Sequence, residues 1–126
     1  MSTVLAVAAG GALGAVARYF MVAGVGLWLG AGFPYGTMAV NVLGSIVFGA
    51  LVEVIVQGWQ VGGDFRAFML VGILGSFTTF SAFSLDAVTL FQRGDTVSAA
   101  LYVLGSVVLA LAGFVAGLVV VKWVMS

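Results

Sequence analysis

Long uncharged stretches are the feature that most limits how this 126-residue chain can fold. No charged side chain occurs in Tyr19–Val52, Ala67–Leu85 or Thr96–Val121, and each stretch approaches or exceeds the roughly 20 residues that a helix needs to cross a bilayer. Charged residues make up only 6% of the chain, whereas soluble domains carry about 25%. The sequence therefore predicts an all-α membrane protein, one domain over residues 1–126. Its four transmembrane helices are expected at roughly 3–24, 36–57, 66–92 and 97–123.

The absence of cysteine and histidine narrows the chemistry that the chain can perform. Disulfides, thiol nucleophiles, Cys/His metal sites and histidine bases are all excluded. The net charge is zero and no basic cluster occurs, which argues against nucleic acid as a partner. No nucleotide-binding motif or catalytic group of residues is present, so the chain is not expected to be an enzyme.

The few charges are almost evenly divided between the two expected membrane faces. With four spans, Arg66 and Lys122 lie on one side and Arg93 on the other, while Arg18 falls within the first span. Two against one is a weak positive-inside bias, so the chain is expected to insert in both orientations, among membrane lipid. Four helices alone hardly enclose a pathway, and an antiparallel homodimer is the simplest closed assembly that fits both features.

Residues 72–84 are unusual for the centre of a membrane span. They contain two glycines, five hydroxyl side chains and three phenylalanines, Phe77, Phe80 and Phe83, at three-residue spacing. Hydroxyls are disfavoured in hydrocarbon unless they satisfy each other or line a polar path. The glycines are expected to loosen the helix, and a break in mid-membrane would expose carbonyl oxygens to a small cation. The phenylalanines are expected to share one face, where their positive ring edges suit an anion.

Other polar residues within the predicted spans have more than one interpretation. Asn41, the only asparagine, either makes an interhelical hydrogen bond or acts as a hydrogen-bond donor in the path. Considered together with the polar third helix, it fits the second interpretation better. Arg18 either extends to the interface or anchors a helix break and attracts anions, and both interpretations stay open. Ser106, on the fourth helix, is expected to add one more hydroxyl to the path.

Three segments, considered together, are more specific than any residue alone. They are GGALGAVARY at 10–19, GTMAVNVLGS at 36–45 and GILGSFTTFSAFS at 72–84. Their sequences, order and spacing resemble the signature segments of the CrcB/Fluc fluoride channels, over essentially the whole chain. The resemblance implies a dual-topology antiparallel homodimer in a prokaryotic plasma (inner) membrane. Two pores at the subunit interface would let fluoride leave the cytoplasm passively.

The resemblance also implies roles for individual residues. Asn41 would line the pore as a hydrogen-bond donor, while Phe80 and Phe83, from different subunits, would present their ring edges to fluoride. The backbone carbonyls of Gly75 and Thr78 would hold a structural sodium ion (Na+) at the dimer axis. The remaining positions matched to the ion pathway are Thr37, Ser81, Ser84, Ser106 and, on the first helix, Arg18.

Two other functions fit a chain of this size. A small proton-coupled multidrug or cation exporter also has four spans and often dual topology, but it needs a carboxylate deep in a helix. Glu53 and Asp86 are expected near helix ends, Glu53 among lipid headgroups and Asp86 in a vestibule or at the interface. A structural subunit without transport would fill the third helix with leucine, valine and small residues. The hydroxyls and phenylalanines of that helix favour the fluoride channel.

Overall fold

The computed structural model describes residues 1–126 and is entirely helical. Four of its helical segments are long and apolar enough to cross a membrane. Three are continuous: α1 (Ser2–Leu29), α2 (Tyr35–Val56) and α6 (Thr96–Met125). The remaining segment, Gly63–Gln92, is the third along the chain. It is divided into α3 (Gly63–Arg66), the π-helix η1 (Ala67–Leu74), α4 (Gly75–Phe77) and α5 (Phe80–Gln92). The prediction of four spans with an interrupted third is confirmed.

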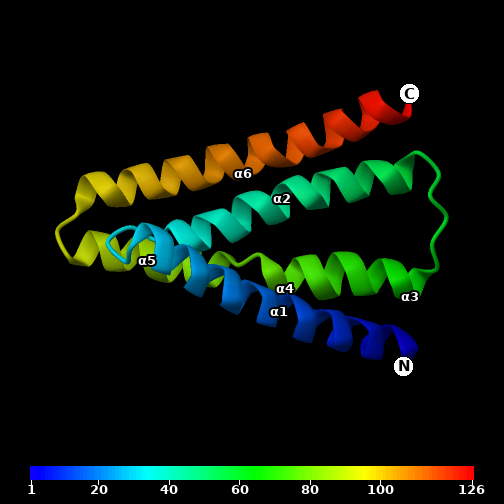
Figure 1. The fold of residues 1–126 in the computed structure, drawn as a ribbon, viewed down its shortest axis with the longest axis horizontal. Coiled ribbons are helices and arrows are strands. Elements are labelled where there is room, and N and C mark those ends of the chain that lie inside the picture. Colours follow the sequence, from blue (N-terminus) through cyan, green and yellow to red (C-terminus); the bar gives the residue numbers. More distant parts are fainter.

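The helices form two closely packed pairs. Both termini and the connection after α2 lie at one end of the molecule, and the connections α1–α2 and α5–α6 lie at the other (Figure 1). Glycines set the closest approaches, because a Cβ on Gly10 or Gly14 of α1 would strike the backbone of η1. In the same way, a Cβ on Gly49 of α2 or Gly117 of α6 would strike the backbone of the opposite helix. Small residues thus let the backbones meet.

The first helix is longer than predicted. It passes through Gly24 and Gly26 and ends at Gly30 (φ 84°), whose N–H bonds to the Gly26 carbonyl. A membrane helix satisfies its own backbone groups, so glycine does not end it there as it often does in water. The α1–α2 connection is therefore shorter than the glycine-rich stretch suggests, and Pro34 directly precedes α2.

The break in the third span lies at two threonines, not at the glycines. Thr78 (φ −83°, ψ 157°) and Thr79 (φ −153°, ψ 122°) are extended, whereas Gly75 is helical (φ −63°, ψ −30°). Gly72 is buried against α1, where its lack of a side chain serves close packing. Of Gly75 and Thr78, the two positions that the resemblance implies for the break, Thr78 is confirmed and Gly75 is not. Glycine in a membrane helix also marks helix contact, as Gly72 does here.

The position of the break also changes the arrangement of the phenylalanines. Phe77 ends α4 and Phe80 begins α5, so the extended residues between them remove the helical i, i+3 relation. The prediction that all three phenylalanines share a face was wrong for Phe77. Only Phe80 and Phe83, both on α5, retain that spacing within one helix.

Candidate functional site

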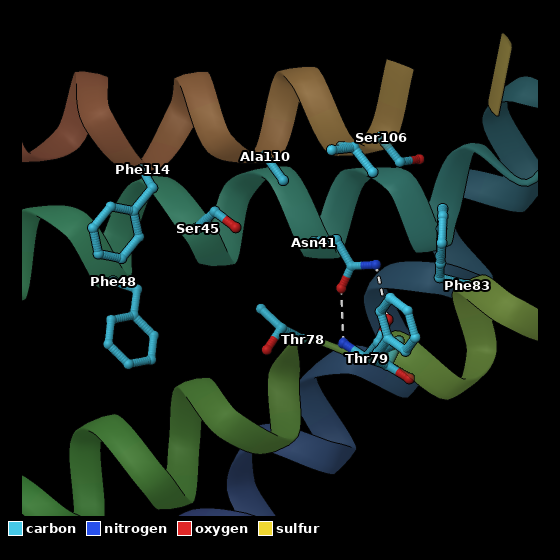
Figure 2. A pocket seen from close by; sticks show the side chains of 11 residues that line it. Asn41, Ser45, Phe48, Thr78, Thr79, Phe83, Ser106, Ala110 and Phe114 are labelled. Atoms are coloured by element: carbon cyan, nitrogen blue, oxygen red, sulfur yellow. Dashed lines mark hydrogen bonds between the residues drawn. The ribbon is translucent and has the colours of Figure 1, made fainter. Parts of the chain in front are cut away.

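A reciprocal pair of hydrogen bonds from Asn41 closes the break. Asn41 Nδ2 donates to the Thr79 carbonyl (2.9 Å), and the Thr79 N–H donates to Asn41 Oδ1 (2.7 Å), as Figure 2 shows. This confirms the interhelical hydrogen bond that was one interpretation of Asn41. Because both ends of the amide are engaged, its orientation is fixed, and the second N–H of its NH2 group remains for another acceptor.

Threonine side chains satisfy further backbone groups at the break. Thr79 Oγ1 accepts the Ala82 N–H (3.1 Å) and caps the first turn of α5. Thr78 Oγ1 donates to the Leu74 carbonyl (2.9 Å), one helical turn back. Thr79 therefore replaces part of the hydrogen bonding that the interruption removes, whereas Thr78 adds a second bond to a carbonyl that still accepts the Thr78 N–H (3.1 Å).

The break leaves carbonyl groups without their helical partners, among them those of Gly75 and Thr78. In an unbroken helix the Gly75 carbonyl would accept from Thr79 N–H, which instead bonds to Asn41. The Thr78 carbonyl would accept from Ala82 N–H, which instead bonds to Thr79 Oγ1. Carbonyl oxygens released in this way at a broken membrane helix are ligands suited to a small hard cation.

An open cavity of about 290 Å³ lies beside the break, between α2, α5 and α6. Ser106 of α6, one of the lining residues, is 4% exposed, and its Oγ is buried without any hydrogen-bond partner. An unpartnered buried hydroxyl of this kind is unusual, because most buried polar atoms in proteins have a hydrogen-bond partner. No charged side chain lines the cavity. The lining consists of Asn41, Ser45, Phe48, Thr78, Thr79, Phe80, Phe83, Ser106, Val107, Ala110 and Phe114.

Aromatic pairs stand at both ends of this cavity (Figure 2). The rings of Phe80 and Phe83 are 5.5 Å apart and tilted by 39°, and Phe80 is 79% exposed. The rings of Phe48 and Phe114 are 5.9 Å apart. The second pair was not predicted, because one isolated phenylalanine on each of two apolar helices gives no local signal.

Tyr102 is a further residue that sequence reasoning missed. It is completely buried, and its hydroxyl donates to Asp86 Oδ2 (3.3 Å). Thr37, which is 6% exposed, lies next to the same hydroxyl. The available signal was a tyrosine one helical turn before Ser106, in an otherwise apolar helix. Asp86, which is partly buried, thus has a neutral hydrogen-bond donor within the protein.

The other predicted pathway residues do not line the cavity in the single chain. Ser84 Oγ donates to the Phe80 carbonyl (2.9 Å), and Ser81 Oγ lies 3.4 Å from Thr79 Oγ1. Arg18 is partly exposed and makes no hydrogen bond or ion pair. Both interpretations of Arg18 therefore remain open.

Glu53 is placed differently from its expected position among the headgroups. It is 7% exposed, and Gln57 Nε2 donates to its Oε1 (2.8 Å). That prediction was wrong, because an amide one turn further along supplies the hydrogen bond that allows the carboxyl group to stay within the protein. Glu53 does not line the cavity beside the break.

These features define a class of protein: a small four-span membrane protein with a broken third span beside an uncharged cavity that has few polar groups. Such a site suits the passage of a small ion.

The chain belongs to the CrcB family, since the family model described as "CrcB-like protein, Camphor Resistance (CrcB)" matches residues 5–118. It is 51% identical over 126 residues to the fluoride-specific ion channel FluC of Cereibacter sphaeroides, with 100% of this chain and 99% of the relative covered. It is 50% identical over 122 residues to FluC of Rhodospirillum centenum, with 97% of each chain covered. FluC of Nitrobacter winogradskyi is 49% identical over 119 residues, with 94% of each chain covered.

Replacing Asn41 is expected to destabilise the fold. Asn41→Ala leaves the backbone N–H of Thr79, a 9% exposed residue, without its partner, at a cost of about 2–4 kcal/mol in the free energy of unfolding. Ser45→Ala, one turn along α2 in the same cavity, is the matched control and should change stability little. Equilibrium unfolding in detergent measures both, and equal stability of the two variants would contradict the role given to Asn41.

Proposed function

We propose that this protein is a passive, fluoride-selective channel of the bacterial inner membrane that releases fluoride from the cytoplasm. The observation that carries the proposal is the uncharged cavity, where an oriented amide and an unpartnered hydroxyl lie beside two phenylalanine rings. The names of relatives aligned over nearly their full length support fluoride as the ion. Passive conduction involves no chemical conversion, so the protein is not an enzyme.

Selective conduction of fluoride depends on replacing its water. Fluoride is small and strongly hydrated, so a dry path needs hydrogen-bond donors along its length. The second N–H of Asn41 and the O–H of Ser106 are donors of this kind. The positive ring edges of Phe80 and Phe83 supplement them. Because none of these groups carries a fixed charge, they stabilise the anion without trapping it.

The proton-coupled exporter is not favoured, because no carboxylate lies where that mechanism needs one. Proton-coupled export needs a carboxylate within the substrate cavity, and no acid lines this one. Glu53 pairs with Gln57, and Asp86 accepts the Tyr102 hydroxyl. The first helix carries no acid at all.

The complete pore is proposed to need a second copy of the chain. The cavity is open along one side, and Phe80, at its margin, is 79% exposed. In an antiparallel homodimer with two pores, Phe80 of one subunit meets Phe83 of its partner. Thr37, Ser81, Ser84 and Arg18 are proposed to border the same pathway in this dimer.

Sodium is proposed to bind where the two copies meet. The residues present fit the ion, because the Gly75 and Thr78 carbonyls have lost their helical partners. Sodium supplies positive charge that neutralises those oxygens. Its effect should be structural, so sodium is expected to raise the melting temperature above that in N-methylglucamine at equal ionic strength, with potassium as the control. Identical melting in all three salts would contradict a sodium site.

Liposomes containing the purified protein are expected to release fluoride rapidly and chloride very little, as read with ion-selective electrodes. Asn41→Ala and Phe80→Ile should each lower fluoride release by about tenfold or more, the equivalent of losing roughly one hydrogen bond or ring contact at the barrier. Phe20→Ile, at an exposed phenylalanine of α1 away from the cavity, is the matched control. Absence of fluoride release from folded protein would refute the channel.

Dual topology predicts equal labelling from both sides of a membrane. The chain has no cysteine, so Gly62→Cys and Gly32→Cys each introduce a single thiol at an exposed glycine, at opposite ends of the molecule. In sealed vesicles a membrane-impermeant maleimide should label about half of either variant. Nearly complete labelling of one variant with almost none of the other would show a single orientation.

A further inference from the structure

We propose that the α1–α2 loop positions the pathway, with Arg93 and Phe33 as positioning residues that hold Tyr102 and, through it, Phe83. The inference rests on the proposed function as far as conduction is concerned. Its structural part, that the loop fixes the environment of the Tyr102 ring, stands independently. Neither residue lines the cavity.

Helix α5 needs contacts that fix its orientation, because it begins as a separate helix after the break. It has 13 residues, carries two of the cavity phenylalanines, Phe80 and Phe83, and follows two extended residues. An extended link transmits little orientation from α4, so contacts made by α5 itself must set its direction. The Asn41–Thr79 pair holds its first end. Its other end requires a second anchor.

Arg93, the C-cap residue of α5, provides this anchor. Its Nη2 donates to the Gly32 carbonyl in the α1–α2 loop (3.0 Å) and lies 3.4 Å from Asp95 Oδ2. The loop is only a few residues long, between Gly30 and Pro34, so one bond to its centre restrains it. A polar cavity of about 70 Å³ separates the loop from α5 around this bond. The loop is therefore held by this hydrogen bond together with the packing of Phe33.

An aromatic chain leads from the restrained loop to the pathway. Phe33 meets Tyr102 edge to face, with ring centroids 5.5 Å apart at 89°. Tyr102 packs on Phe83 at 5.3 Å, and Phe83 packs on Phe80 at 5.5 Å. Tyr102 has no exposed surface and belongs, with Leu90, to the buried hydrophobic cluster between α5 and α6. If the loop moves, Phe33 uncovers one face of this ring, and the packing behind Phe83 changes with it.

Arg93 has a second possible role, which the experiment must separate from positioning. Its side chain is 47% exposed, so its charge alone would attract anions to that end of the molecule. Phe33 has no charge. A shared effect of Phe33 and Arg93 substitutions therefore indicates positioning, whereas independent effects indicate attraction.

The structural experiment uses fluorine NMR on one tyrosine. The chain has three tyrosines, and Tyr19→Phe with Tyr35→Phe leaves Tyr102 as the only site for 3-fluorotyrosine. Phe33→Leu and Arg93→Met should each shift or broaden the Tyr102 resonance. Arg93→Lys, which can still donate to the loop, should stay near the parent. Arg66→Met is the matched control, since it removes the same charge from the opposite end of the third span.

The functional experiment measures fluoride efflux of the unlabelled variants. Phe33→Leu and Arg93→Met should each lower flux by about three- to tenfold, which corresponds to the loss of one hydrogen bond or ring contact. The double variant should be no worse than the poorer single one. Arg93→Lys should recover most of the flux, and Arg66→Met should retain it.

The two experiments separate the structural role of the loop from its effect on conduction. An unchanged Tyr102 resonance in both variants, or flux losses that multiply in the double variant, would overturn the positioning role. If the parent protein passes no fluoride, the proposed function fails, but the resonance still decides whether the loop holds Tyr102. A shifted resonance with unaltered flux would refute the link to the pathway.

Discussion

The hydrogen-bond pair between Asn41 and Thr79 is the interaction on which the rest of the site depends. The bilayer core offers no water to an interrupted backbone, so an extended residue there is tolerated only if the protein supplies its partners. Asn41 supplies a donor and an acceptor to one residue, because an amide side chain has the same groups as the backbone that it replaces. The break then fixes where α5 begins, and with it the rings that border the cavity.

The hydroxyl groups around the break divide into two sets with different uses. Thr78, Thr79 and Ser84 bond to nearby backbone groups, and Thr79 among them caps α5 where the span is interrupted. Ser106 lines the cavity without a partner. A hydroxyl-rich segment is therefore not uniformly a polar path, since the hydroxyls of Thr78, Thr79 and Ser84 are engaged by the backbone. The donor that remains for an ion comes instead from another helix, where the backbone is intact.

The sequence predicted the spans better than it predicted the site. Uncharged stretches are a local property, and hydrophobic length alone decides which segments cross a bilayer, so four spans could be foreseen. The position of the break could not, because Gly72 serves helix packing while Thr79 depends on a residue 38 positions away. Tyr102 and Phe114 were missed for the same reason. Each gains its significance from a contact with a distant helix, and nothing in the neighbouring sequence records that contact.

The placement of charge explains why such a site suits conduction more than tight binding. A cation in the cavity would hold an anion strongly and slow its departure. Neutral donors also replace the water around the anion, but they bind it less strongly, so that it can leave. The charged residues Asp86 and Arg93 are accordingly bonded to groups outside the cavity lining. Asp86 accepts from the Tyr102 hydroxyl, and Arg93 donates to the Gly32 carbonyl. Both of these bonds also fix the helix that carries the rings. The charged groups therefore help to fix the position of the residues that border the pathway, and no charged group lines the pathway itself.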